Sequence, residues 1–302
     1  MGRLVTILTL ASALLANPAA DPAYRAGIEK WRQQREARLK AEDGWLAVAG
    51  LFWLEEGANR FGSGSDNAIV LPAGAAPAIA GTFELRQGTV GVRVEPGVTV
   101  TVAGQPVTAM ALRSDDPGPP DVLRLGRLTL QVIARSGKYG IRMKDPESET
   151  RRTFAGLQWF PIRDDLRLEA RFVPWSSPRS IAVPNILGQV NDLPSPGYAE
   201  FTLAGRTLRL EPVIEEPGAE ELFFIFRDQT AGKETYPAGR FLYAPMPKDG
   251  RVVLDFNKAY SPPCAFTAFA TCPLPPPQNR LPIRIEAGEK NPHGHPQRPR
   301  SS

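Results

Sequence analysis

The chain has 302 residues, of which 42% are hydrophobic, 23% charged and 8% aromatic, a composition typical of a folded globular protein. The length predicts about two domains. With 31 prolines and 27 glycines, we expect many turns and few long helices. The two histidines, His293 and His295, lie close to the C-terminus. Their position excludes a Ser-His-Asp or Cys-His nucleophile in the body of the chain, and classical zinc sites built from several His and Cys ligands.

The formal net charge of +4 is carried mainly by the two ends of the chain. Arg3 contributes +1, and residues 287–302 contribute +2. Removing these charges from +4 leaves +1 for the body. A nearly neutral body argues against nucleic acid as a partner, because phosphate binding needs a concentrated basic face.

Residues 1–20 have the three-part form of a secretory signal peptide. Arg3 is followed by a mostly apolar run over residues 4–15 and by a run rich in small residues over 16–20. The apolar run is shorter than the roughly 20 residues of a transmembrane helix. An alternative is a buried N-terminal helix, since no Ala-x-Ala sequence directly precedes Asp21. We expect a secreted or periplasmic protein without a transmembrane span.

Residues 21–44 are predicted to form an amphipathic helix. Asp21 can cap its first turn, and Pro22 suits the first helical position. Four apolar side chains fall close to one helical face: Tyr24, Ile28, Trp31 and Leu39. We expect this face to dock on the body of the protein, in preference to a membrane.

Residues 45–145 contain short apolar strands at a spacing of roughly ten residues, with Gly and Pro between them. One of the turns, at Ala103 and Gly104, is a tight hairpin signal. Strands at this spacing indicate a β-sandwich or a barrel.

Two phrases in this part, NRFGSGSDNAIVLP (59–72) and LRLGRLTLQV (123–132), resemble the opening and closing strands of forkhead-associated domains. Those domains read phosphothreonine through an arginine after the first glycine, a Ser-x-x-His turn and an Asn-Gly turn. This chain has Ser63 at the arginine position, residues 78–81 without histidine at the second motif, and Ala103-Gly104 at the third. The resemblance implies a similar sandwich and gives no support for phosphopeptide binding.

Residues 154–290 are predicted to form a second β-rich domain, after a polar connector. Residues 166–173 alternate between apolar and polar side chains, and residues 221–226 form a continuous apolar run typical of a central strand. The predicted fold class is mainly β: an N-terminal amphipathic helix, two β-rich halves and a proline-rich C-terminal loop. Residues 291–302 are expected to be a disordered tail.

Several long phrases closely resemble an uncharacterised bacterial and archaeal family that is known only as a domain of unknown function. They are GLFWLEEG (50–57), DFNKAYSPPCAF (255–266), TCPLPPPQNRL (271–281) and EAGEK (286–290). The likeness runs from about Tyr24 to Lys290. It implies no particular activity, because none is established for that family.

Seven polar side chains of the second half could converge on a ligand-binding pocket: Asp228, Glu234, Tyr236, Arg240, Asp255, Asn257 and Tyr260. Asp255 and Asn257 would face the same side of a continuous strand. The alternative is structural, with Asp228 capping the turn at residues 229–232 and Arg240 pairing with a carboxylate.

Residues 261–281 form a proline-rich loop that contains Cys264 and Cys272. In an oxidising compartment a disulfide between them is the favoured interpretation. It would stabilise the fold by about 2–3 kcal/mol. Two buried thiols, or a metal or redox role, stay open as alternatives, although two thiolates without histidine partners are a weak basis for a zinc site. No metal and no cofactor are expected.

These features favour a non-catalytic, exported β-rich module that binds a small molecule, a glycan or a protein partner. The main alternative is a carboxylate-based hydrolase with a site near Asp228, Arg240 and Asp255, in which Asp228, Asp255 or Glu234 acts as acid or base. A purely structural role in the cell envelope is a third possibility.

Overall fold

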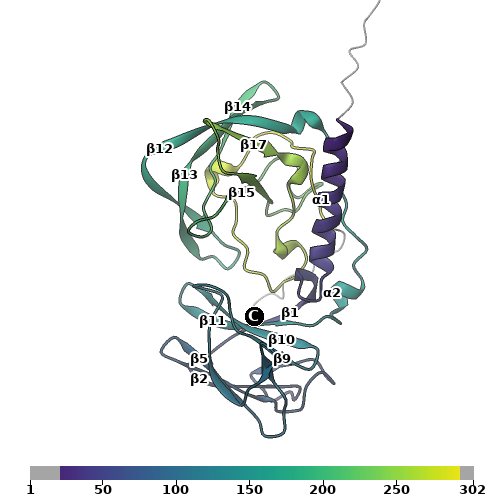
Figure 1. Ribbon diagram of the computed structural model, residues 1–302, viewed down its shortest axis with the longest axis vertical. Helices are drawn as coiled ribbons and strands as arrows, with labels where there is room; N and C mark the ends of the chain where they lie inside the picture. The colour runs from purple at the N-terminus through teal and green to yellow at the C-terminus, as the bar shows by residue number, and fades with distance from the viewer. Residues whose placement is uncertain (1–20, 293–302) are drawn as a thin grey trace, which may run out of the picture.

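The computed structural model describes residues 21–292, and it is mainly β with one long helix at the start (Figure 1). Helix α1 and the C-terminal half form one lobe, and residues 48–144 form a second lobe beside it. The predicted signal peptide (1–20) and all of the predicted tail beyond residue 292 lie outside the described residues.

Helix α1 (Pro22–Lys40) packs along the C-terminal half of the chain (Figure 1). Asp21 caps it as expected, since its side chain accepts the N–H of Ala23 at 3.0 Å. Ile28 and Leu39 are each 1% exposed, and Tyr24 and Trp31 are half-buried, so the predicted apolar face packs on the body of the protein. A short 3-10 turn, η1 (Trp45–Ala47), leads into the first strand. Among the described residues, no helix has the length and apolarity needed to cross a membrane.

The N-terminal lobe is a β-sandwich whose two sheets share one hydrophobic core, and neither sheet closes into a barrel. Phe61 and Phe83 lie fully buried in this core, with ring centres 4.6 Å apart. The hairpin expected at Ala103 and Gly104 is present, and both residues have the positive φ angles that such a tight turn requires. The six-stranded sheet has the order β1 (Val48–Trp53), β11 (Lys138–Lys144), β10 (Leu128–Arg135), β9 (Val122–Leu125), β6 (Thr101–Val102) and β7 (Gln105–Pro106). The five-stranded sheet has the order β3 (Ile69–Val70), β2 (Gly57–Gly62), β4 (Gly81–Arg86), β5 (Thr89–Val94) and β8 (Ala109–Leu112).

The C-terminal lobe contains a four-stranded antiparallel sheet and a separate two-stranded hairpin. It follows a connector that includes the short helix α2 (Glu149–Arg152) and the 3-10 turn η2 (Asp164–Leu166). The sheet has the order β14 (Arg206–Leu210), β13 (Val190–Leu203), β12 (Arg167–Pro184) and β17 (Arg251–Asp255). The hairpin pairs β15 (Glu221–Phe226) with β16 (Arg240–Pro245).

Strand β15 is covered on both faces, which explains why its sequence is continuously apolar. Leu222, Phe224 and Phe226 pack into one hydrophobic core, together with the four-stranded sheet. Phe223 and Ile225 point the other way, into a second core that includes Leu39 of α1. A strand that is covered on both faces needs apolar residues at every position.

The proline-rich segment 261–281 is irregular but buried. It contains two 3-10 turns, η4 (Pro263–Ala265) and η5 (Pro277–Asn279). Phe266 and Leu281 are both buried. The hydroxyl of Thr267 donates to the carbonyl of Val48 at 3.1 Å, so this segment also joins the two lobes.

Candidate functional site

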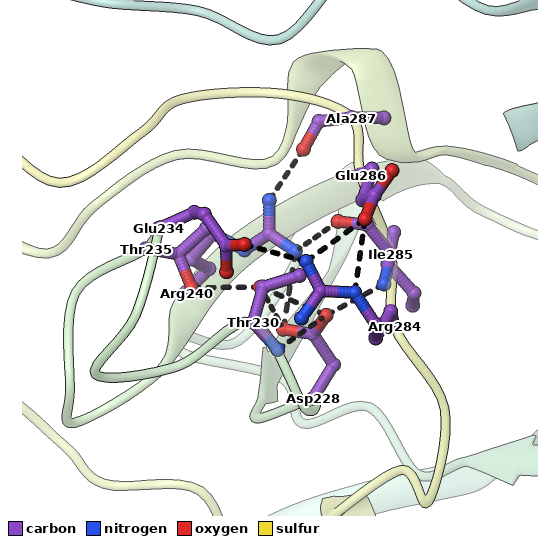
Figure 2. A network of polar contacts seen from close by, with 9 residues as sticks. All are labelled: Asp228, Thr230, Glu234, Thr235, Arg240, Arg284, Ile285, Glu286 and Ala287. Atoms are coloured by element: carbon purple, nitrogen blue, oxygen red, sulfur yellow. Dashed lines mark hydrogen bonds and ion pairs between the residues drawn. The ribbon is translucent and has the colours of Figure 1, made fainter.

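Asp228 and Arg240 form a closed, buried ion pair in the C-terminal lobe (Figure 2). Each side chain is 1% exposed. Arg240 Nη2 donates to Asp228 Oδ1 at 3.2 Å and to the carbonyl of Ile285 at 2.9 Å, while Nη1 donates to the carbonyl of Ala287. Asp228 Oδ2 accepts the N–H of Ile285 at 2.7 Å. The pair therefore fastens residues 285–287 to the end of the β15–β16 hairpin.

Asp228 also accepts hydrogen bonds from the turn that follows it. Its oxygens accept the hydroxyl of Thr230 at 2.8 and 2.9 Å, and Thr230 in turn contacts the Thr235 hydroxyl at 2.9 Å. Glu234 lies at the surface, where it pairs with Arg284 at 2.6 Å (Figure 2). Burial lowers the pKa of Arg240, and Asp228 opposes that shift. This is the structural arrangement that the sequence left as the alternative to a ligand pocket.

Asp255 and Asn257 meet around Tyr24 of α1. The Tyr24 hydroxyl donates to Asp255 Oδ1 at 2.8 Å, and Asn257 Nδ2 donates to the Tyr24 oxygen at 3.0 Å. Strand β17 ends at Asp255, which caps the 3-10 turn η3 (Phe256–Lys258) by accepting the N–H of Asn257 at 3.2 Å. The two residues are thus brought together by a cap and not by the parity of a continuous strand. Burial, and next Asp255, raise the pKa of Tyr24, so its hydroxyl stays protonated and donates.

A cavity of about 670 Å³, which we call the α1 groove, opens between α1 and the strands beside it. Its volume lies within the roughly 300–1,000 Å³ of small-molecule sites. It forms because residues at i, i+4 and i+7 of a helix share a face, and alternate residues of a strand share a side. The lining comprises Trp31, Arg35 and Arg38 of α1; Arg167 of β12; Glu221 of β15; Tyr243 and Pro245 of β16; Val253 and Asp255 of β17; Lys258 of η3; and Tyr260.

Positive charge predominates in the α1 groove, with four cationic side chains against the two carboxylates of Glu221 and Asp255. Three of the cations, Arg38, Arg167 and Lys258, make no side-chain hydrogen bond or ion pair with the described part of the chain. Arg167 also lies over the Tyr24 ring at 5.2 Å, but none of the three forms an ion pair within the described residues, so the groove keeps an excess of positive charge.

The fourth cation, Arg35, forms an ion pair with the buried carboxylate of Glu289. Its Nε donates to Glu289 Oε2 at 3.3 Å and its Nη2 to the carbonyl of Ser261 at 2.9 Å. The Arg35 side chain is 9% exposed and that of Glu289 is fully buried. The guanidinium carbon lies 4.5 Å from the centre of the Tyr260 ring. Burial raises the pKa of Glu289, and Arg35 opposes the rise.

Aromatic rings line the groove beside the cations. The rings of Tyr243 and Tyr260 are stacked at 6.3 Å with an angle of 13° between their planes. Trp31 lies 6.5 Å from Tyr260, and Phe223 stacks on the buried side of Tyr243 at 4.8 Å. Burial raises the pKa of both tyrosines, so the wall stays neutral.

A second cavity of about 480 Å³, the acidic hollow, shares Glu221 and Tyr243 with the α1 groove. Its other lining residues are Glu215, Glu216, Ala219 and Glu220. The Tyr243 hydroxyl donates to Glu215 Oε2. Burial raises the pKa of Glu215. One end of the combined depression is thus cationic and the other acidic.

Cys264 and Cys272 are both buried thiols, so the structure does not contain the predicted disulfide. The Cys264 N–H donates to the Cys272 sulfur at 3.2 Å, and the Cys272 N–H donates to the Cys264 sulfur at 3.4 Å. Burial raises the pKa of Cys272, which disfavours the thiolate that forms disulfides. Tyr236, another predicted site residue, donates its hydroxyl to the Cys264 carbonyl at 3.1 Å and supports this loop. The described residues contain no group of three or more His, Cys, Asp or Glu side chains that could hold a metal ion.

The sequence-predicted site residues are therefore divided among several places. Asp255 and Tyr260 line the α1 groove, while Asp228 and Arg240 lie in the closed ion pair. Sequence reasoning missed Arg35, Glu289 and the part that Trp31 plays in the groove. A usable signal was the arginine at position 35, seven residues after Ile28 and four before Leu39, on the face of the helix that is otherwise buried.

Comparisons with known proteins identify a family but no activity. The profile of the family described as "Protein of unknown function (DUF1684)" matches residues 152–290. An uncharacterized protein of Haloarcula marismortui, solved by NMR, is 31% identical; the match covers 50% of this chain and 85% of that protein, with a TM-score of 0.42. No match was found among curated proteins.

The chain is also partly similar in structure to forkhead-associated domains. The FHA-2 domain of a Mycobacterium tuberculosis ABC transporter is 27% identical; the match covers 30% of this chain and 77% of that domain, with a TM-score of 0.23. The FhaA FHA domain, solved in complex with an intracellular domain, is 20% identical over 31% of this chain and 97% of its own length, with a TM-score of 0.23. The family match and the archaeal relative together show that the chain belongs to the DUF1684 family of proteins of unknown function.

Proposed function

We propose that the protein is a non-catalytic binding module that holds a small molecule in the α1 groove. The observation that carries this proposal is the lining of the groove, where three cations that form no ion pair with the described residues lie beside neutral aromatic rings. Ligand sites generally combine a concave shape and apolar or aromatic walls with a few well-placed polar groups.

The groove is preorganised for binding because contacts with other parts of the protein fix its central side chains. Glu289 and the Ser261 carbonyl fix Arg35, and the Phe223 ring supports Tyr243. Side chains that are fixed before binding lose little conformational entropy when a ligand arrives. A small molecule suits the cavity volume better than a glycan chain or a protein partner does.

The alternative of a carboxylate hydrolase is disfavoured by the position of Asp228. Its side chain is 1% exposed, and its oxygens are occupied by Arg240, Thr230 and the N–H of Ile285. An acid or base must come within hydrogen-bond reach of the substrate proton that it transfers. Asp228 and Arg240 would have to leave the closed network before they could act beside Asp255.

Export of the protein remains a prediction from residues 1–20. It would place the binding module outside the cytoplasm, where small solutes first meet the cell. We include export in the proposal on the strength of the signal-peptide pattern alone.

A ligand screen with a blocked groove tests the proposal. Val253 lies half-buried in the groove on β17, and Val253→Trp should fill the space. Val190→Trp, at an exposed position on β13, is the matched control. Small molecules that bind the folded state should raise the melting temperature of the wild type and of the control, and should leave that of Val253→Trp unchanged. Ligands that stabilise all three proteins equally, or a charge-diverse library that stabilises none, would refute the proposal.

A further inference from the structure

We infer that the α1 groove binds a small organic oxyanion, a carboxylate or phosphate ester attached to a ring with a flat face. This inference rests on the proposed function and names the class of ligand. Three features of the groove support it: the cations that form no ion pair in the described part of the chain, the geometry of Arg35, and the arrangement of cations, aromatic rings and carboxylates from one end of the depression to the other.

The unpaired cations come from three separate elements and line the same cavity. Arg38 lies on α1, Arg167 at the start of β12, and Lys258 on η3. Like charges repel, and the two carboxylates in the lining leave the groove with an excess of cations, so an anion bound among these side chains would relieve the repulsion. A concave surface with one sign of charge also concentrates ligands of the opposite sign.

Arg35 adds a preorganised donor at the buried side of the groove. Two of its three nitrogens are occupied, Nε by Glu289 and Nη2 by the carbonyl of Ser261. Nη1 has no hydrogen-bond partner among the described residues, although nine-tenths of the side chain is buried. The Tyr260 ring below the guanidinium group further restricts its orientation. A guanidinium nitrogen fixed in this way suits a carboxylate or phosphate oxygen.

The aromatic rings explain why the anion should carry a ring. Trp31, Tyr243 and Tyr260 line the groove beside the cations. Aromatic side chains offer flat apolar surface for stacking against an aromatic ring or the apolar face of a sugar. A bare inorganic anion would leave this surface unused.

The acidic hollow gives the ligand a direction. It begins where the α1 groove ends, at Glu221 and Tyr243, and carries the carboxylates of Glu215, Glu216 and Glu220. Carboxylates repel an anionic group, so the oxyanion should lie toward Arg35 and α1 and the ring toward Tyr243. The two ends of the depression thereby select one orientation.

Isothermal titration of the full chain with matched ligand pairs tests this inference. The probes are phenyl phosphate and benzoate against benzyl alcohol, and glucose 6-phosphate and glucuronate against glucose. Arg38→Gln, Arg167→Gln and Lys258→Gln each remove one cation without breaking an internal ion pair, although Arg167→Gln also removes a contact with the Tyr24 ring. Arg206→Gln, at an exposed position on β14 outside the groove, is the charge-matched control.

We expect at least one anion to bind more tightly than its neutral partner. Each groove variant should weaken that binding about tenfold, the low end for loss of a hydrogen bond to a charged group, and the control should match the wild type. Neutral partners that bind equally well, or anions that bind all variants alike, would overturn the inference. If neutral ligands bind and Val253→Trp blocks them, the proposed function stands while the inference fails. If no probe of either kind binds and the wider screen is also negative, both fail.

Discussion

Neutralising Asp228 should severely destabilise the C-terminal lobe. In Asp228→Asn the side chain keeps its size, but Arg240 loses the carboxylate that forms its ion pair and stays 1% exposed. The amide also offers one acceptor oxygen, where the carboxylate accepts the Ile285 N–H on one oxygen and Arg240 on the other. The variant thus leaves a buried cation without its counter-charge.

The expected loss in free energy of unfolding is about 3–5 kcal/mol, the usual result of removing one partner of a buried ion pair. For a protein of this size, about 2–4 °C of melting temperature corresponds to each kcal/mol, so the melting temperature should fall by about 6–20 °C. Residues 285–287 should lose their attachment first, because the pair binds them directly.

Urea unfolding followed by circular dichroism and tryptophan fluorescence measures this loss. Glu234→Gln is the control, since it removes the same charge from a surface pair with Arg284 and should leave the midpoint essentially unchanged. The double variant Asp228→Leu with Arg240→Met, which buries no charge, should still fall short of the wild-type stability, because it leaves the N–H of Ile285 and the carbonyls of Ile285 and Ala287 without partners. A loss below about 1 kcal/mol in Asp228→Asn would refute the structural assignment of this pair.

Further predictions concern the buried acid, the two thiols and one glycine. The raised pKa of Glu289 means that the folded state binds its proton more tightly, so this group favours folding below the ordinary glutamate pKa of about 4.3 and loses that contribution as pH rises through the folded-state pKa. Urea unfolding between about pH 4 and pH 8 should therefore show the wild type losing stability relative to Glu289→Gln, and a constant difference would contradict this. Because burial keeps Cys272 protonated, oxidised glutathione should leave Cys264 and Cys272 as two thiols that are titratable after unfolding, whereas their loss as a Cys264–Cys272 disulfide would argue against this. Gly288→Ala should destabilise far more than Gly218→Ala in thermal unfolding: both glycines have positive φ, but a Cβ at position 288 would lie 2.3 Å from the Ala259 carbonyl oxygen while position 218 is open. Equal losses at the two glycines would show that the close contact is not limiting.

The elements of the fold could be predicted where a local pattern determines them. The alternation of residues 166–173 predicted the start of β12, which begins at Arg167, and the continuous apolar run at 221–226 predicted β15, which is covered on both faces. The apolar positions of the first helix predicted the face that packs on the body of the protein, where Ile28 and Leu39 are buried. In each case, the spacing of apolar residues along the chain already specifies which side is covered.

The site was harder to predict because it depends on distances between segments far apart in the sequence. Asp228, Arg240 and Asp255 are similar polar residues in neighbouring segments, yet two of them neutralise each other in the interior while the third faces a cavity. Composition cannot distinguish a buried ion pair from a binding residue. Arg35 was overlooked because its partner, Glu289, lies at the other end of the chain.

The most direct test of the account is a crystal structure of the protein with the phosphate or carboxylate probe that binds most tightly in solution. We predict electron density for the oxyanion beside Arg35 Nη1, with the ring against Tyr243 and Tyr260. Density for the bound probe elsewhere on the molecule, with the α1 groove empty, would contradict it.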